Sequence, residues 1–200
     1  QYITNNKLQD VTLIGHSIGG YLSLCLASTI KEHLKQVVVV DALPFLAGTS
    51  NPLAPTGIDS AAAEKEVARY EAMTAAEMRN TQLQTAKFLC RDSTRWNTIA
   101  DWGAASHRRT FAWTIHEMMR GDLRQSIAAI QVPVLVLAAW CEMPQYPLFS
   151  RQYVIDLFAA QYEKCSTCTV QTATGNAKHF IMYDAPEWYF AAVDNFILKP

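Results

Sequence analysis

The stretch "VTLIGHSIGGYLSLCLA", residues 11–27, decides the fold because it places one serine among three glycines where an apolar run meets a helical pattern. The run Val11–Gly15 is typical of a parallel strand buried on both faces. From Ile18 to Leu34, apolar side chains recur at helical spacing. Glycine inside a strand or helix costs roughly 0.5–1 kcal/mol relative to alanine, so the cluster around Ser17 indicates a backbone geometry that other residues cannot adopt.

The residues Gly15-His16-Ser17-Ile18-Gly19 match the pattern G-x-S-x-G at a strand-to-helix turn. Such a turn holds the serine in a strained conformation and presents its hydroxyl at the carboxyl ends of the strands, where α/β sheets bind ligands. The N–H of Ile18 and the helix dipole could then stabilise an oxyanion. The alternative is a glycine-rich helix start with an incidental serine, which the flanking strand and helix disfavour.

The rest of the chain alternates strands and helices around one long interruption. Lys35–Pro44 predicts a second buried strand, and strand, helix, strand in this order implies a right-handed crossover in a parallel sheet. Residues 45–122 contain no convincing strand and favour helices, which predicts a cap or lid. A third strand, a helix, a fourth strand and a closing helix are then expected over 132–140, 150–165, 168–174 and 184–198.

These elements predict an α/β fold with a mostly parallel sheet and a helical cap inserted between the second and third strands of this chain. The core would comprise residues 1–44 and 123–200, and the cap residues 45–122. Aromatic side chains of the cap favour an apolar substrate pocket, which His16 would help to shape. The cap residues expected in this pocket are Trp96, Trp102, Phe111 and Trp113.

A serine needs a base within hydrogen-bond reach to act as a nucleophile. His179 follows the last predicted strand, so its loop lies at the same carboxyl edge of the sheet as Ser17. The order serine first and histidine last is that of a Ser-acid-His triad in α/β hydrolases. A surface or packing role is the alternative for His179, and His107 and His116 in the cap are expected to be structural.

Composition excludes several other classes of function. The net charge of −1 comes from 17 basic and 18 acidic residues without runs of one sign, which gives no footprint for nucleic acid. No apolar stretch approaches the ~20 residues of a membrane span. Of five cysteines, only Cys165 and Cys168 are closely spaced, and their context favours loop cysteines that could form a disulfide over a redox or zinc site. A cytoplasmic and a periplasmic or secreted location both remain open.

The motifs "GHSIGG", "VVVVDALPF" and "AKHFIMYD" resemble those of the α/β-hydrolase superfamily, in particular cap-bearing bacterial serine hydrolases. The resemblance implies a Ser-acid-His triad and acyl-ester chemistry. It offers two positions for the acid: Glu142, after the strand that follows the cap, and Asp41, at the end of the strand beside the nucleophile strand. Asp184 lies too close to His179 in sequence to be favoured.

Superfamily members also carry strands ahead of the nucleophile strand, with a loop that donates a second oxyanion N–H. Only ten residues precede Val11 here, and they contain no glycine. We therefore expect Val11–Gly15 to be unpaired on one side, or to pair with a second chain or a missing N-terminal segment that completes the sheet.

The leading hypothesis is a serine carboxylesterase acting on a small or medium acyl ester, with no metal or organic cofactor. The serine disfavours relatives with an aspartate nucleophile, such as dehalogenases. Lactonases, carbon–carbon bond hydrolases, perhydrolases and aminopeptidases share the triad and remain open. The alternatives from other classes are a non-catalytic ligand-binding protein with a lid and an incomplete, inactive hydrolase.

Overall fold

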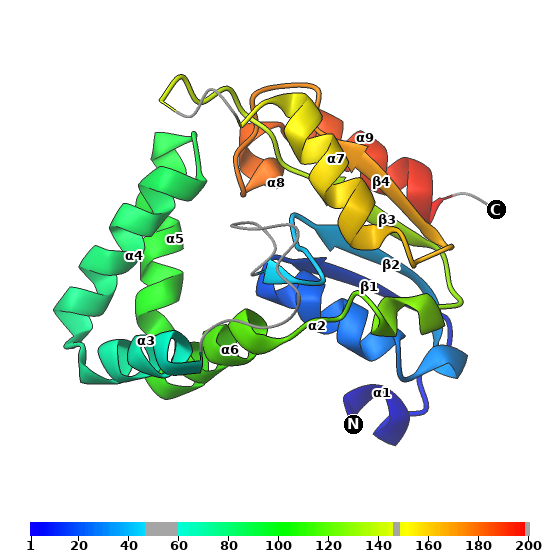
Figure 1. Ribbon diagram of the computed structural model, residues 1–200, viewed down its shortest axis with the longest axis horizontal. Coiled ribbons are helices and arrows are strands. Elements are labelled where there is room, and N and C mark those ends of the chain that lie inside the picture. Colours follow the sequence, from blue (N-terminus) through cyan, green and yellow to red (C-terminus); the bar gives the residue numbers. More distant parts are fainter. Residues whose placement is uncertain (47–59, 146–148, 199–200) are drawn as a thin grey trace.

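Four parallel strands form the sheet in the computed structural model, which describes residues 1–46, 60–145 and 149–198 (Figure 1). Their order across the sheet is β1-β2-β3-β4, the same as their order along the chain. All three neighbouring pairs are parallel. The bounds are β1 (Val11–His16), β2 (Leu34–Val40), β3 (Val134–Ala138) and β4 (Cys168–Thr172). The predicted α/β class with a parallel sheet is confirmed.

The two central strands are buried on both faces because residues 37–40 of β2 and all five residues of β3 are apolar. Val37 and Val39 point into a cluster under α2 (Ile18–Ala27) and α7 (Arg151–Tyr162). Their neighbours Val38 and Val40 point to the opposite face. That face is covered by α8 (Ile181–Asp184) and α9 (Pro186–Ile197) (Figure 1).

The first long helix is shorter than the sequence pattern suggests, because α2 ends at Ala27 rather than at Leu34. The hydroxyls of Ser28 and Thr29 donate hydrogen bonds back to the carbonyls of Leu24 (2.8 Å) and Leu26 (2.9 Å). The same two carbonyls also accept backbone N–H groups of residues 28–30, so the side chains add second donors at the helix end. The chain then forms a 3-10 turn over Lys31–His33 and enters β2 directly.

Between β2 and β3, residues 60–120 form four α-helices that we call the helical segment. They are α3 (Ser60–Ala72), α4 (Ala75–Leu89), α5 (Trp96–Ala105) and α6 (Arg108–Arg120). Helix α3 packs on α6 and α4 on α5, and the group lies to one side of the sheet (Figure 1). Residues 47–59 of the predicted cap lie outside the described residues.

Strand β1 forms one edge of the sheet, because among the described residues it pairs only with β2. A short helix, α1 (Tyr2–Asn5), precedes it, so residues 1–10 add no strand to this edge. The side chain of Ile14 in this edge strand is 53% exposed, so the helices that bury Val38 of β2 do not cover it. This agrees with the expectation that Val11–Gly15 is unpaired on one side.

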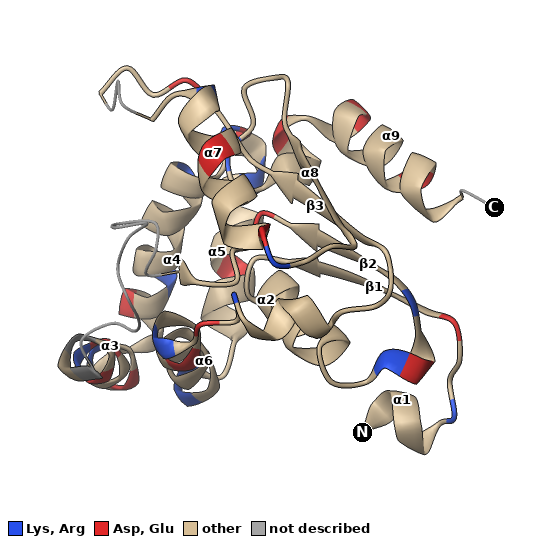
Figure 2. Ribbon diagram, turned by 45° about the vertical axis from the view of Figure 1, so that its right-hand side comes forward, with Lys and Arg blue, Asp and Glu red and all other residues tan. Residues whose placement is uncertain are grey.

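Cys165 and Cys168 form a disulfide between α7 and β4, with their Cα atoms 5.3 Å apart. Within the described residues, no group of three or more His, Cys, Asp or Glu side chains is placed to hold a metal ion. None of the helices in the described part of the chain has the length and apolar character needed to cross a bilayer. Charged residues of both signs are distributed over the helices and loops of the protein (Figure 2).

Candidate active site

Ser17 occupies the turn between β1 and α2 with φ 55° and ψ −120°. Positive φ is uncommon for residues other than glycine and costs energy, so the surrounding structure must hold it. One restraint is the N–H of Ser17, which donates to the carbonyl of Val40 at the end of β2 (2.9 Å). Ile18 is the first residue of α2, where N–H groups have no partner within the helix.

The glycines around Ser17 have different roles. A Cβ at Gly15 would lie 2.2 Å from the carbonyl oxygen of Gly19, and one at Gly20 would lie 2.7 Å from the Cβ of Ala42. A Cβ at Gly19 would meet no atom of the described residues within 4 Å. The close approach of strand and helix therefore requires glycine at positions 15 and 20, whereas position 19 has space for a side chain.

His179 and Asp41 form a hydrogen-bonded pair across 138 residues, with His179 Nδ1 2.6 Å from Asp41 Oδ2. The other carboxylate oxygen of Asp41 accepts the N–H of Ala139 at the end of β3 (2.8 Å). Asp41 itself has φ 46°, a conformation that aspartate tolerates better than most residues. The His179 and Asp41 side chains are 18% and 16% exposed, so solvent screens their contact only partly.

His16 contacts both the ring and the backbone of His179. Its Nε2 is 2.9 Å from the His179 carbonyl oxygen, and the centroids of the two rings are 4.5 Å apart. Burial, together with the neighbouring His179, lowers the pKa of His16 from 6.5 to about 4. His16 is therefore neutral at neutral pH and donates its Nε2 proton to the loop that carries His179.

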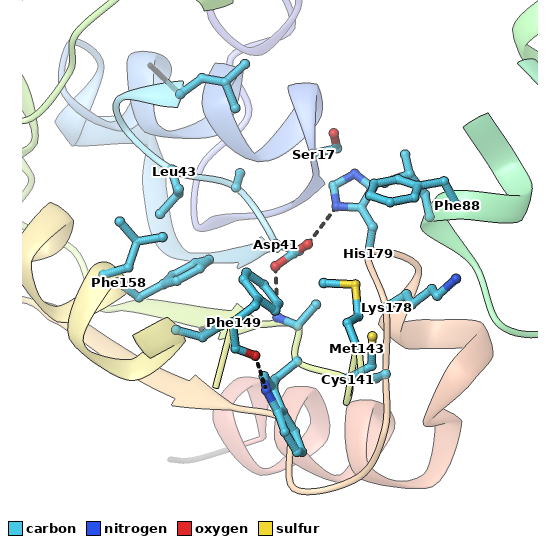
Figure 3. A pocket seen from close by; sticks show the side chains of 18 of the residues that line it. Ser17, Asp41, Leu43, Phe88, Cys141, Met143, Phe149, Phe158, Lys178 and His179 are labelled. Atoms are coloured by element: carbon cyan, nitrogen blue, oxygen red, sulfur yellow. Dashed lines mark hydrogen bonds and ion pairs between the residues drawn. The ribbon is translucent and has the colours of Figure 1, made fainter. Parts of the chain in front are cut away.

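Ser17, Asp41 and His179 line one cavity of about 590 Å³ at the carboxyl end of the sheet (Figure 3). In Figure 3 the second ring nitrogen of His179 faces the side on which Ser17 lies, away from Asp41. The described residues give the Ser17 hydroxyl no hydrogen bond, and such contacts often tighten only when substrate binds. The walls are mainly apolar: α7 contributes Val154, Leu157 and Phe158, and the helical segment contributes Phe88, Leu89 and Met118.

Residues 2–192 match the profile of the alpha/beta hydrolase family. The chain belongs to this family. No protein of curated function matches it. Among solved structures, a hydrolase from Pseudomonas aeruginosa PA01 superposes with a TM-score of 0.72 and 17% identity, over 99% of this chain and 68% of that one.

An esterase from Exiguobacterium antarcticum superposes with a TM-score of 0.70 and 14% identity, over 99% of this chain and 70% of that one. An enol-lactonase from Burkholderia xenovorans LB400 superposes with a TM-score of 0.71 and 15% identity, over 99% of this chain and 69% of that one. At these identities, the likeness shows a shared fold alone.

Glu142, the second candidate for the acid, is exposed in this alpha/beta hydrolase and does not line the cavity. Its N–H donates to Asn176 Oδ1 (2.7 Å), and no contact joins its carboxylate to His179 among the described residues. The structure therefore pairs His179 with Asp41 and not with Glu142.

The four cap aromatics expected in the pocket are not among the described residues that line the cavity. Trp96 donates its Nε1 proton to the carbonyl of Cys90, and Phe111 packs edge-on against Tyr70. Trp102 and Trp113 are 55% and 42% exposed. Helical spacing indicates which residues share a helix face but not what that face meets, so Phe88 and Met118 were missed although they lie on helices predicted from the sequence.

Substitution of the two glycines that flank Ser17 should have opposite effects. Gly15→Ala places a methyl group against the Gly19 carbonyl and should lower the free energy of unfolding by about 3 kcal/mol or prevent folding. Gly19→Ala adds a methyl group where there is space, and alanine is the better helix former. The free energy of unfolding should therefore stay the same or rise by up to about 1 kcal/mol. Urea denaturation of both variants measures this, and equal destabilisation would contradict the packing described.

The depressed pKa of His16 predicts acid destabilisation. Unfolded His16 binds a proton near pH 6.5 and folded His16 near pH 4, so the unfolded state binds more protons between these values. The free energy of unfolding should therefore decrease as the pH is lowered from about 6.5 to about 4, by about 3 kcal/mol in full. His16→Gln, which keeps an amide donor, should flatten the dependence, and equal slopes for the two proteins would refute the assignment.

Proposed function

We propose that this chain is a serine hydrolase that cleaves carboxylic esters through Ser17, His179 and Asp41. The observation that carries the proposal is the 2.6 Å contact between His179 and Asp41 in a cavity that Ser17 also lines. A serine at a strained strand-to-helix turn, an imidazole and an orienting carboxylate together form the arrangement used for acyl transfer in several unrelated folds. Membership of the alpha/beta hydrolase family supports this assignment.

In the proposed reaction, the Ser17 hydroxyl attacks the ester carbonyl while His179 accepts its proton at Nε2. The carboxylate of Asp41 holds the proton on Nδ1 and stabilises the imidazolium that forms. His179 then returns the proton to the leaving alcohol, which leaves an acyl group on Ser17. A water molecule that gives its proton to His179 then attacks the acyl group. Ser17 takes the proton back from His179, and the carboxylic acid is released.

The developing oxyanion would be stabilised at the start of α2. The N–H of Ile18 belongs to the first turn, where it has no helical acceptor and the dipole is positive. Donors of this kind contribute strongly because they are oriented before charge develops.

The cavity supports a small or medium apolar acyl ester as substrate. Its volume of about 590 Å³ lies within the range of small-molecule sites, and its apolar walls include residues of α7 and of the helical segment. We propose that the helical segment acts as a cap over this cavity. A lactone would react by the same steps, with its leaving alkoxide tethered to the acyl group, and the enol-lactonase of the same fold makes lactones a second substrate class to assay.

Ser17→Ala should abolish both labelling by a fluorophosphonate probe and hydrolysis of a p-nitrophenyl ester while leaving the fold intact. Removal of the nucleophile of a triad typically costs about 10⁶ in kcat. Ser28→Ala is the matched control, because its hydroxyl bonds to Leu24 at the far end of the same helix. Absence of labelling in the wild-type protein would contradict the proposal and favour a non-catalytic ligand-binding protein or an incomplete, inactive hydrolase.

Asp41→Asn and Glu142→Gln should separate the two acid candidates. Asparagine tolerates the positive φ of position 41 and can still accept from Ala139, but its amide would place a donor against His179 Nδ1. The resulting tautomer should lower kcat by about 10⁴. Glu142→Gln changes an exposed side chain and should leave the rate of ester hydrolysis nearly unchanged. The opposite pattern would transfer the role to Glu142.

A further inference from the structure

Asp184, at the end of α8, accepts backbone hydrogen bonds from two segments that are far apart in sequence. Its Oδ1 accepts the N–H groups of Arg91 (2.9 Å) and Asp92 (3.0 Å), which follow α4 of the helical segment. Its Oδ2 accepts the N–H of Lys178 (2.9 Å), the residue before His179. One carboxylate thus connects the helical segment to the loop that carries His179.

Three more hydrogen bonds join the same two segments. The N–H of Phe180 donates to the carbonyl of Leu89 (3.3 Å), and Nζ of Lys178 donates to the carbonyl of Lys87 (3.2 Å). The guanidinium of Arg91 donates to the carbonyl of Asn176 (2.5 Å). We call this contact region, residues 87–92 against residues 176–184, the α4–His179 joint.

We propose that Asp184 is a positioning residue that fixes the His179 imidazole against Asp41 and Ser17 by anchoring the α4–His179 joint. This inference rests on the proposed function. Asp184 does not line the cavity, so it acts through the backbone of Lys178 and not on the substrate.

The geometry explains why a carboxylate is needed at this position. Both oxygens of Asp184 accept from N–H donors, and a carboxylate has acceptor sites only. An asparagine would have to turn its NH₂ group toward one set of these donors and lose that side of the joint. His16 holds the carbonyl of His179 (2.9 Å), whereas Asp184 holds the N–H of Lys178 on the other side of the same residue in the chain, so loss of the Asp184 contact would release the backbone that leads into His179.

The test compares Asp184→Asn with Asp92→Asn in the full chain. Asp92→Asn makes the same charge change at the same joint, but the Asp92 side chain bonds to Thr94 and has no hydrogen bond to the His179 loop among the described residues. Two readouts are measured at a temperature where circular dichroism shows both variants folded. They are the rate of fluorophosphonate labelling and the far-downfield ¹H resonance of the proton between His179 and Asp41.

Asp184→Asn should slow labelling by about 10²-fold, the loss expected when a catalytic group is misplaced by about 1 Å. It should also shift or broaden the downfield resonance, while Asp92→Asn changes neither. Labelling at the wild-type rate in Asp184→Asn would overturn the proposal, as would slowed labelling with an unaltered resonance. If the wild-type protein is not labelled, the proposed function fails, and the resonance alone still tests the positioning.

If Asp184→Asn does not fold, Arg91→Met takes its place. Arg91 is exposed, and its side chain contributes only the bond to Asn176 at the joint. The expected result is a severalfold slower labelling together with a shifted resonance. Wild-type behaviour in both readouts would overturn the proposal.

Discussion

The backbone at Ser17 has a φ of 55°, and the rest of the site depends on the contacts that hold it there. Such a conformation costs on the order of 1–3 kcal/mol and persists only where its surroundings determine it. Here α2 passes so close to β1 that only glycine fits at position 15. Leu24 and Ala27 of α2 are fully buried against the sheet, so packing of the helix offsets the strain of the turn that begins it.

The parallel sheet brings the four strand ends to one edge, and each end supplies one part of the site. Ser17 follows β1, Asp41 follows β2, and His179 comes from the loop after β4. The end of β3 contributes a backbone N–H, that of Ala139, which fixes the Asp41 carboxylate (2.8 Å). Side chains separated by 138 residues therefore meet without long loops.

The positions of the strands, Ser17 and His179 could be predicted from local patterns. Apolar runs indicate the strands, the glycine cluster indicates the turn at Ser17, and His179 directly follows the last predicted strand. The acid could not be chosen this way. Asp41 and Glu142 both follow predicted strands. They differ only in the direction that the backbone takes after its strand, which the sequence pattern does not indicate. Asp41 turns back through a positive φ toward the cavity, whereas Glu142 faces solvent. The prediction that aromatic residues of the helical segment line the pocket was wrong for a related reason. The pattern of residues 96–113 indicates helices but does not indicate how these helices pack against the core.

Two carboxylates near the site, Asp41 and Asp184, differ in role through the donors that surround them. Asp41 accepts one backbone N–H and keeps its second oxygen for His179. The oxygens of Asp184 accept backbone N–H groups, which leaves the carboxylate no acceptor directed at the imidazole. Its closeness in sequence to His179 disfavours a triad role, and the same closeness lets it hold the Lys178 backbone. Position along the chain therefore separates the carboxylate that contacts the base from the one that holds its loop.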